Sequence, residues 1–398
     1  MIKRLKVRNF KSLRDFEVDF EKFNVLIGRN NSGKSNIIDC IKFLSNLMDE
    51  RNLKIAIHRR EESYKDIVYG RDYKNNISIE AVVELNGEEF TYRISFSGVN
   101  EDIRIEDDEI RIKSDRGEEI IRWEDRKDTY TLTFTRGDTI KEMLYSNVKS
   151  LIFSGSYPTL SEDTRKSLYR FSEFMKSVKL YEFYPKEMKE PERRVRKSLQ
   201  NYIIDENGSN ILEVLHTLYL ESKQTFDRVS ELLQVIEDVE GLKIMPRGGG
   251  IYMALKEKRF KEPFPLWNMS DGSLKIIGCI TALHTTDFFG PPYGDYKTKI
   301  KKPLFCFEEP ENYIHSRLLE FLVNLMKDSD AQIILATHSP YFIDRCEPNE
   351  IIIVERVNGA TEARRIKDTE KLRKVMKKYG VSLGEIYYSD EFEKEREE

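Results

Sequence analysis

The sequence predicts an α/β nucleotide-binding fold that is divided by a large insertion. The first observation is a G-x-x-x-x-G-K-S segment, residues 28–35, which follows a short apolar run and precedes apolar residues at helical spacing. The second is a change of the hydrophobic period to two after residue 75 and back to helical after residue 156. The third is a pair of later apolar runs, 304–307 and 333–336, which end in polar residues as buried parallel strands do.

Each segment of the chain has its own pattern. Residues 1–75 predict strands at 2–7, 16–20 and 23–27 and a helix after the G-x-x-x-x-G-K-S segment, which together form the N-terminal half of the nucleotide domain. Alternating apolar residues broken by Asn-Gly, Ser-Gly and Arg-Gly pairs predict an antiparallel β-meander over 76–154. We expect a helical lid subdomain at 155–240, the C-terminal half of the nucleotide domain at 241–390 and a charged tail at 391–398.

The composition restricts the class of protein. A chain of 398 residues with 39% apolar and 34% charged residues can bury a large core, and its net charge of -4 argues against a globally basic nucleic-acid binder. No apolar run reaches ~18 residues and no secretory h-region is present, so we expect a cytoplasmic protein without a membrane segment. The four cysteines form no C-x-x-C pair and predict buried thiols rather than a zinc site or disulfides.

The residue types of the segment 28–35 suit a polyphosphate. Its glycines let backbone N–H groups turn towards phosphate oxygens, and the helix that follows adds the positive end of its dipole. Lys34 supplies a charge for the β and γ phosphates, and Ser35 offers a hydroxyl to Mg²⁺. We therefore expect ATP or GTP, with Mg²⁺, to bind here, with contacts from Asn30, Asn31, Ser32, Gly33, Lys34 and Ser35.

Acidic residues follow the apolar run 304–307. A carboxylate at the end of a buried strand can hold Mg²⁺, and the next one can orient a water molecule for attack on the γ phosphate. We assign Glu308 to the metal and Glu309 to the water. The alternative for such an acidic pair alone is a solvated turn after a core strand.

Two further sets of residues complete the candidate site. His338 follows the apolar run 333–336 and could donate a hydrogen bond to a γ-phosphate oxygen, although a histidine after a strand is often structural. Ser270, Asp271 and Gly272 stand at the start of a predicted helix, where they either cap the helix or present N–H groups to an anion.

Together these motifs resemble the ATPases of the SMC and RecF branch of the ABC superfamily, in particular the compact group of prokaryotic DNA-repair and phage-defence systems. The resemblance covers residues 1–75 and 241–384. The matching motifs are Asn9-Phe10-Lys11-Ser12-Leu13 (opening motif), residues 28–35 (Walker A), Ser270-Asp271-Gly272-Ser273 (signature), Glu308-Glu309-Pro310-Glu311 (Walker B), Ala336-Thr337-His338-Ser339-Pro340 (switch) and Ser382-Leu383-Gly384-Glu385.

The resemblance implies an ABC/SMC-type P-loop ATPase head with an inserted β-meander and a helical lid. It implies ATP and Mg²⁺ as ligands, nucleotide contacts from Lys11 and Asn36, and catalysis by Glu309 and His338. It also implies a homodimer in which Ser270, Asp271 and Gly272 of one subunit close over ATP bound to the other.

Three positions depart from the family pattern. Glu308 stands where these proteins usually have aspartate, and no glutamine occurs between Asn36 and Leu199 to act as the Q-loop ligand. Ile314-His315-Ser316 replaces the usual Leu-His-Pro, which gives His315 a structural role only. The insertion of about 160 residues is too short for a long SMC coiled coil and fits a compact RecF-like lid.

The expected function is an ATP-dependent dimerisation switch in a DNA-associated process, antiviral defence or DNA repair. No nuclease-like carboxylate cluster stands out in the insertion or the tail, so we expect a separate effector protein, such as a nuclease. One alternative is a transport-type ABC subunit, which the N-F-K-S opening and the insertion disfavour. Another is an ATP-dependent assembly scaffold with little turnover, against which Glu309 argues.

The densest basic cluster of the chain lies in the predicted lid and follows Tyr181, Phe183 and Tyr184. It consists of Lys186, Lys189, Arg193, Arg194, Arg196 and Lys197. Two such clusters brought together in a dimer could follow a nucleic-acid backbone. Interleaved acids leave a solvated helix face with i,i+4 ion pairs as the alternative.

Overall fold

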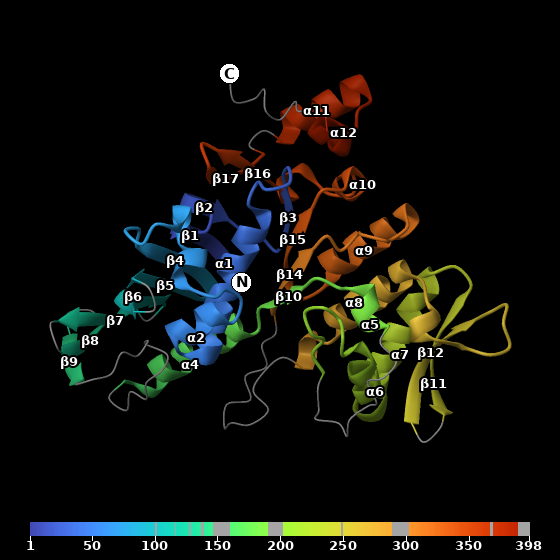
Figure 1. The fold of residues 1–398 in the computed structure, drawn as a ribbon, viewed down its shortest axis with the longest axis horizontal. Coiled ribbons are helices and arrows are strands. Elements are labelled where there is room, and N and C mark those ends of the chain that lie inside the picture. The colour runs from blue at the N-terminus through green and yellow to red at the C-terminus, as the bar shows by residue number, and fades with distance from the viewer. Residues whose placement is uncertain are drawn as a thin grey trace. The chain divides into compact units, whose positions relative to one another are not determined.

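The computed structural model describes residues 1–99, 102–115, 117–126, 129–136, 139–145, 160–189, 202–247, 250–288, 302–366 and 369–388 (Figure 1). The chain divides into two compact units. Unit 1 comprises Met1–Lys22, Ile27–Val178 and Ile352–Arg365, and unit 2 comprises Phe23–Leu26, Lys179–Ile351 and Ile366–Glu398. Each unit therefore combines segments from both ends of the chain, whereas the five consecutive domains expected from the sequence stay a prediction.

Unit 1 is built on an eight-stranded antiparallel sheet in the order β2-β1-β4-β5-β6-β7-β8-β9. Its strands are β1 (Ile2–Phe10), β2 (Leu13–Asp19), β4 (Ile77–Leu85), β5 (Glu88–Val99), β6 (Asp102–Ser114), β7 (Gly117–Arg126), β8 (Thr129–Arg136) and β9 (Thr139–Tyr145). The predicted β-meander is thus confirmed. It continues the sheet that the N-terminal strands begin, since β4 pairs directly with β1.

The other described elements of unit 1 are helices and one hairpin, whose first residue, Ile351, is assigned to unit 2. They are α1 (Lys34–Glu50), α2 (Leu53–His58), α3 (Tyr64–Ile67), the 3₁₀ turn η1 (Tyr69–Arg71), α4 (Glu162–Lys176), β16 (Ile351–Val357) and β17 (Ala360–Arg365). The phosphate-binding sequence joins α1 to β3 (Phe23–Ile27), whose first four residues belong to unit 2.

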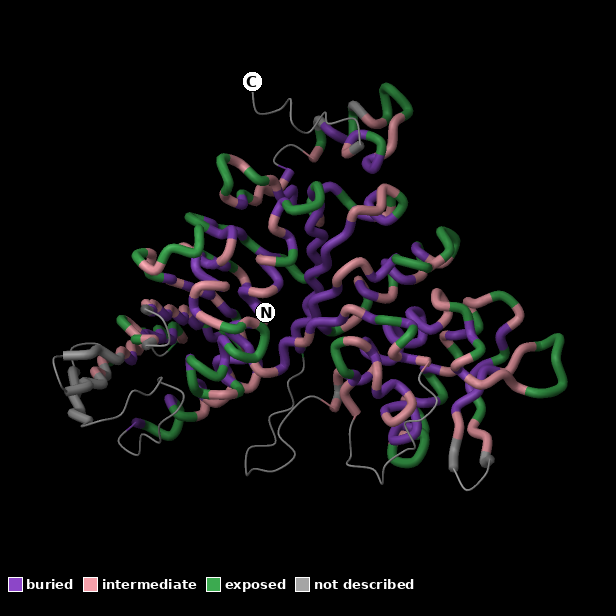
Figure 2. Tube along the Cα trace, viewed as in Figure 1, coloured by how far each residue is buried: buried purple, intermediate pink, exposed green. Residues whose placement is uncertain are grey.

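One face of the eight-stranded sheet forms the core of unit 1, and Figure 2 shows the buried positions of these strands. Helix α1 packs there through Phe43, whose ring centroid lies 5.6 Å from that of Phe10 and 5.7 Å from that of Phe96. Helix α4 packs through Phe171, 5.5 Å from Phe90. These aromatic contacts attach both helices to the meander because each ring buries a large apolar area.

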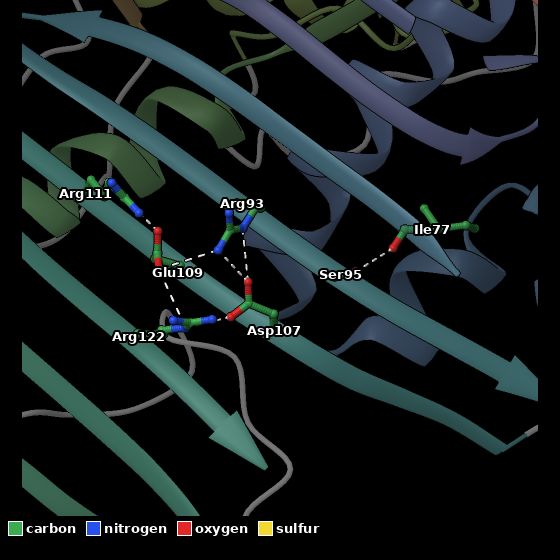
Figure 3. Close-up of polar contacts among 7 residues, drawn as sticks. All are labelled: Ile77, Arg93, Ser95, Asp107, Glu109, Arg111 and Arg122. Carbon is green, nitrogen blue, oxygen red and sulfur yellow. Dashed lines mark hydrogen bonds and ion pairs between the residues drawn. The ribbon is translucent and has the colours of Figure 1, made fainter. Parts of the chain in front are cut away.

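The opposite face of the same sheet carries charges of alternating sign. Six charged residues occupy directly paired positions, one on each of six neighbouring strands. In the strand order β2, β1, β4, β5, β6 and β7 they are Glu17, Lys6, Glu80, Arg93, Glu109 and Arg122. In Figure 3 the Asp107 carboxylate lies between Arg93 and Arg122, at 2.9 Å from each. Opposite charges on facing strands each contribute about 0.2–1 kcal/mol and favour this register over a slipped one.

Unit 2 contains a sheet segment in which β10 (Lys179–Tyr181), β14 (Leu304–Glu308), β15 (Gln332–Thr337) and β3 are neighbours in that order. β14 is parallel to both β10 and β15. All six residues of β15 are buried, as are the first four of β14, which explains the apolar runs 333–336 and 304–307 within these strands (Figure 2). The ends of both predicted strands therefore lie at the same edge of one sheet.

Helices and a small second sheet make up the rest of unit 2. The helices are α5 (Pro185–Met188), α6 (Ile211–Glu221), α7 (Lys223–Leu232), α8 (Asp271–His284), α9 (Ser316–Asp328), α10 (Pro340–Ile343), α11 (Thr369–Tyr379) and α12 (Leu383–Tyr388). The 3₁₀ turns are η3 (Leu233–Val235), η4 (Leu266–Asn268), η5 (Thr286–Phe288) and η6 (Pro348–Glu350), and the second sheet consists of β11 (Val239–Arg247), β12 (Gly250–Glu257) and β13 (Phe264–Pro265).

The described part of the range 155–240, which the sequence predicted as helical, includes strand β10, and β11 begins near its end at Val239. Residues Lys179–Tyr181 form β10 at the edge of the parallel sheet, where Leu180 pairs with Cys306. Three residues are too few to establish a period of two, so the sequence pattern does not reveal this strand. Within the described part of the chain, no helix is long and apolar enough to cross a membrane.

Candidate functional site

The phosphate loop, residues 28–35, keeps the predicted order of strand, loop and helix between β3 and α1. Asn31 and Gly33 have positive φ angles of 65° and 106°. Left-handed residues within such a loop turn successive N–H groups towards a common side, which creates a concave surface for an anion. The Lys34 amine is buried and donates to the carbonyls of Gly28 (2.8 Å) and Arg29 (3.2 Å).

Both glycines of the loop approach other atoms too closely for a side chain. A Cβ on Gly28 would lie 2.1 Å from the Val354 carbonyl oxygen on β16, and one on Gly33 would lie 2.0 Å from Thr361 Oγ1 on β17. The two strands of the β16–β17 hairpin therefore support the loop directly. Only glycine fits at these two positions.

Thr361 holds the loop through a buried hydroxyl network. Its Oγ1 donates to the Ser32 carbonyl at 2.8 Å and lies 2.6 Å from Ser12 Oγ, while its own N–H donates to the Ser12 carbonyl at 2.9 Å. The Asn36 amide also donates to Ser12 Oγ at 2.7 Å. The opening motif around Ser12 and the start of α1 are thereby joined to the loop.

Thr361→Val should loosen the phosphate loop, because the isosteric methyl group cannot donate to the Ser32 carbonyl. We expect a loss of about 1–3 kcal/mol in the free energy of unfolding and a measurably weaker affinity for a fluorescent ATP analogue. Urea denaturation and equilibrium titration measure the two effects. The control is Thr361→Ser, which keeps the hydroxyl; equal behaviour of the two variants would contradict a role for this hydrogen bond.

Two basic side chains of unit 1 lie around the loop motifs. Lys11, expected to contact nucleotide, forms ion pairs with Asp39 (2.7 Å) and Glu61 (2.6 Å). Burial lowers the pKa of Lys11, but these carboxylates outweigh that effect and raise it overall. A phosphate contact from Lys11 would therefore replace an existing ion pair. Arg356 Nη1 donates to Asn31 Oδ1 of the loop at 3.2 Å.

The phosphate loop fits a triphosphate. The glycine cradle leaves no room for a Cβ, and Lys34 is already folded across the loop. Ser32 Oγ is buried and has no hydrogen-bond partner among the described residues. A buried hydroxyl without a partner is costly and suits a site that an oxygen-rich ligand completes.

In unit 2, the carboxyl end of β14 carries the predicted acids. Glu309 follows the strand with a φ of 44°, and its N–H donates to the Ala336 carbonyl on β15 at 2.9 Å. The Asn312 side chain donates to Glu309 Oε2 at 2.5 Å. His338, beyond the end of β15, has Nε2 at 3.8 Å from Glu309 Oε1, so the two predicted catalytic side chains lie together.

Glu311, which received no role from the sequence, is buried beneath the same turn. It accepts a hydrogen bond at Oε1 from the Thr337 hydroxyl, whereas its Oε2 has no partner within the described segments. Burial raises the pKa of Glu311 above its usual value. Thr337 Oγ1 in turn accepts from the Ser339 N–H at 2.9 Å, so Glu311 is connected to the segment that bears His338.

The predicted signature forms the N-terminus of α8. Ser270 caps the helix, since its Oγ accepts from the Ser273 N–H at 3.1 Å. The side chain of Asp271 is paired with Lys189 at 2.5 Å. A Cβ on Gly272 would lie 2.3 Å from the Tyr313 carbonyl oxygen, so this glycine permits close packing on the turn after β14. The cap is confirmed, and contacts of these residues with a nucleotide stay a prediction.

Several other predicted residues have a defined place. His315 caps α9 by accepting from the Arg317 N–H at 3.3 Å, in agreement with a structural role. All four cysteines are buried and free. Tyr181 and Phe183 are buried and cannot stack on bases in this conformation. The basic residues Arg193, Arg194, Arg196 and Lys197 lie outside the described residues.

Three residues that the sequence reasoning missed support the candidate site. Thr361 gives no sequence signal because it is 329 residues from its partner Ser32. Glu311 ends the quoted Walker B motif and Lys275 lies two residues after the quoted signature, but only the structure distinguishes them. Both are buried, and a buried charged group needs partners.

Comparison with protein families matches residues 23–344 to the family described as "AAA domain, putative AbiEii toxin, Type IV TA system". The match includes the phosphate loop, the signature, Glu308, Glu309 and His338.

Among individual proteins, the chain is similar to Structural maintenance of chromosomes protein 1B of Homo sapiens, with 35% identity over 101 residues, 24% of this chain and 8% of that protein. It is also similar to an ATP/GTP phosphatase of Helicobacter pylori, with 32% identity over 95 residues, 22% of this chain and 26% of that protein. The chain thus matches less than two thirds of the length of either relative.

Among solved structures, the fold is similar to that of an SmcHead bound to the C-winged helix domain of ScpA. The TM-score is 0.52 at 15% identity, and the match covers 94% of this chain and 99% of that one. This likeness establishes the fold. The family match over most of the chain shows that the protein belongs to this AAA domain family, and its fold is that of an ABC/SMC-type P-loop ATPase head.

Proposed function

We propose that the protein hydrolyses ATP to ADP and phosphate, and that ATP binding assembles two copies head to tail. In this dimer the signature of one subunit closes over the nucleotide held by the other. Engagement on ATP and release after hydrolysis then act as a switch on a separate effector protein.

The observation that carries the proposal is the pair formed by Glu309 and His338 at the ends of neighbouring parallel strands, with 3.8 Å between Oε1 and Nε2. Glu309 would accept a proton from the water that attacks the γ phosphorus while the bond to the β-phosphate oxygen breaks. His338 would donate to a γ-phosphate oxygen, where charge increases during transfer.

The phosphate loop would hold the nucleotide through its N–H groups and Lys34. Ser35 and Glu308 would hold Mg²⁺, which neutralises phosphate charge when bound. We propose that the phosphate loop and Glu309 of one subunit act on the same nucleotide.

The names of the relatives guide the proposal about biological role. One relative is a chromosome-maintenance protein, and the family description refers to a toxin of a type IV toxin–antitoxin system. We therefore propose a DNA-associated role in antiviral defence or DNA repair. The similar SmcHead binds a domain of another protein, ScpA, which supports a separate partner for this chain.

Complementation between subunits tests the composite site. Lys34→Ala and Ser270→Arg should each abolish hydrolysis, and a mixture should recover activity because one site of each mixed dimer has an intact loop and an intact signature. With random pairing and independent sites, we expect roughly a quarter of the wild-type rate. Steady-state phosphate release measures it.

A matched mixture serves as control. A mixture of Lys34→Ala and Glu309→Gln subunits should recover no hydrolysis. Each subunit supplies both Lys34 and Glu309 to its own site, so neither site of a mixed dimer is intact. No recovery with Ser270→Arg, although mixed dimers form, would mean that Ser270 works within its own subunit or only caps its helix. Absence of hydrolysis by the wild-type protein would favour the assembly scaffold.

A further inference from the structure

The N-terminal part of α8 contacts the turn 309–314 at two points. Gly272 packs against the Tyr313 carbonyl so closely that a Cβ would lie 2.3 Å from its oxygen. One helical turn later, Lys275 Nζ donates to the Glu309 carbonyl at 3.1 Å. Residues three apart lie on the same helix face, so this face of α8 packs directly on the backbone that carries Glu309.

Lys275 occupies a position that is unusual for an amine. Only 4% of the residue is exposed, and burial lowers the pKa of Lys275 against the opposing effect of nearby acids that include Glu311 and Glu309. Its Nζ also lies 5.7 Å from the centre of the Tyr313 ring. Burying a charged group costs free energy, which its hydrogen bond and the nearby carboxylates offset in part.

The Glu309 backbone needs such support. Its φ of 44° belongs to the left-handed region, which costs a residue with a Cβ about 1–2 kcal/mol. The Glu309 carbonyl accepts from the Asn312 N–H at 3.2 Å as well as from Lys275. Because the backbone conformation determines where the carboxylate points, the donors to this carbonyl also control the position of Glu309 Oε1 relative to His338.

We propose that Lys275 is a positioning residue that couples the signature helix to Glu309 within one subunit. The coupling rests on the proposed function. If the signature contacts the nucleotide of the partner subunit, a shift of α8 on that contact reaches the Glu309 carbonyl through Lys275. Nucleotide binding at one composite site of the dimer then changes the position of the turn 309–314, and with it Glu309, at the other composite site.

Lys275→Met tests the proposal, since methionine keeps most of the apolar stem but cannot donate. Without nucleotide, amide hydrogen exchange in 309–314 should rise by about tenfold or more, because the strained turn loses one of its restraints. We expect kcat to fall by about 10- to 100-fold, since a small misplacement of a reacting group has effects of this size. KM and the affinity for an ATP analogue should stay within about twofold, because the proposed role of Lys275 is to position Glu309 and not to bind the nucleotide.

The matched control is Lys327→Met in the same unit. Lys327 also donates to a carbonyl, that of Arg345 at 3.4 Å, and also lies over an aromatic ring, that of Phe23 at 5.4 Å. Its loss should leave exchange in 309–314 and kcat unchanged. If Lys275→Met does not fold, Gly272→Ala takes its place; its Cβ pushes α8 away from the turn and should give the same exchange pattern.

The outcomes separate this proposal from the proposed function. The proposal would be overturned if amide hydrogen exchange in 309–314 were the same in Lys275→Met as in the wild-type protein. It would also be overturned if the fall of kcat came with a comparable loss of nucleotide affinity and a lower melting temperature. If the wild-type protein does not hydrolyse ATP, the proposed function fails. The exchange measurement still decides whether Lys275 fixes the turn.

Discussion

Lys34→Ala is expected to weaken ATP binding by about 100-fold or more, because several charge-assisted hydrogen bonds to phosphate are lost at once. The side chain is buried and already lies across the loop, bonded to the carbonyls of Gly28 and Arg29. It therefore needs little reorganisation to meet a phosphate oxygen. Titration with a fluorescent ATP analogue measures the loss.

The control for this change lies on the same helix. Lys42→Ala also removes a lysine from α1 but lies two turns beyond the phosphate loop. It should leave ATP affinity close to that of the wild-type protein. If both variants bind ATP equally well, the phosphate loop does not hold the nucleotide through Lys34.

Glu309→Gln is expected to preserve ATP binding and slow hydrolysis by about 10²- to 10⁴-fold, the usual contribution of a general base. Glutamine can still accept the hydrogen bond from Asn312, so the turn should keep its shape. Since ATP is then bound but not consumed, a dimer that depends on ATP should accumulate. Phosphate release and light scattering measure the two effects.

Glu320→Gln makes the same chemical change at an exposed position on α9 and should alter neither measurement. Hydrolysis by Glu309→Gln at the wild-type rate would remove Glu309 as the base. If Glu309→Gln hydrolyses ATP slowly but forms no ATP-dependent dimer, Glu309 would still be assigned as the general base. The proposed dimerisation switch would then be contradicted.

The fold is predictable from the sequence wherever its signals are local. The glycine pattern of residues 28–35 lies between a strand and a helix as expected, and the alternation that begins at Ile77 forms a continuous meander. The residues Glu309 and His338 come together because apolar runs before them form neighbouring parallel strands, whose ends necessarily share an edge.

The remaining features depend on contacts between distant segments. The sequence around Thr361 does not indicate that its hydroxyl supports the phosphate loop, and Lys275 reads as an ordinary helical lysine until its burial is known. Strand β10 is too short for a periodic signal and is defined by its pairing with β14. A single sequence carries periodicity and motifs, whereas these features arise from tertiary packing.

The support that β17 gives to the phosphate loop has a consequence for the order of events at the ribosome. Ser32 and Thr361 are separated by 329 residues. At ordinary rates of translation, Thr361 is added on the order of half a minute after Ser32. During that interval the loop lacks the hydroxyl that holds the Ser32 carbonyl and the β16 and β17 backbone against which its glycines pack. A nascent chain therefore contains the complete Walker A motif long before the phosphate loop can adopt its folded conformation. Full nucleotide affinity arises only as synthesis of unit 1 ends.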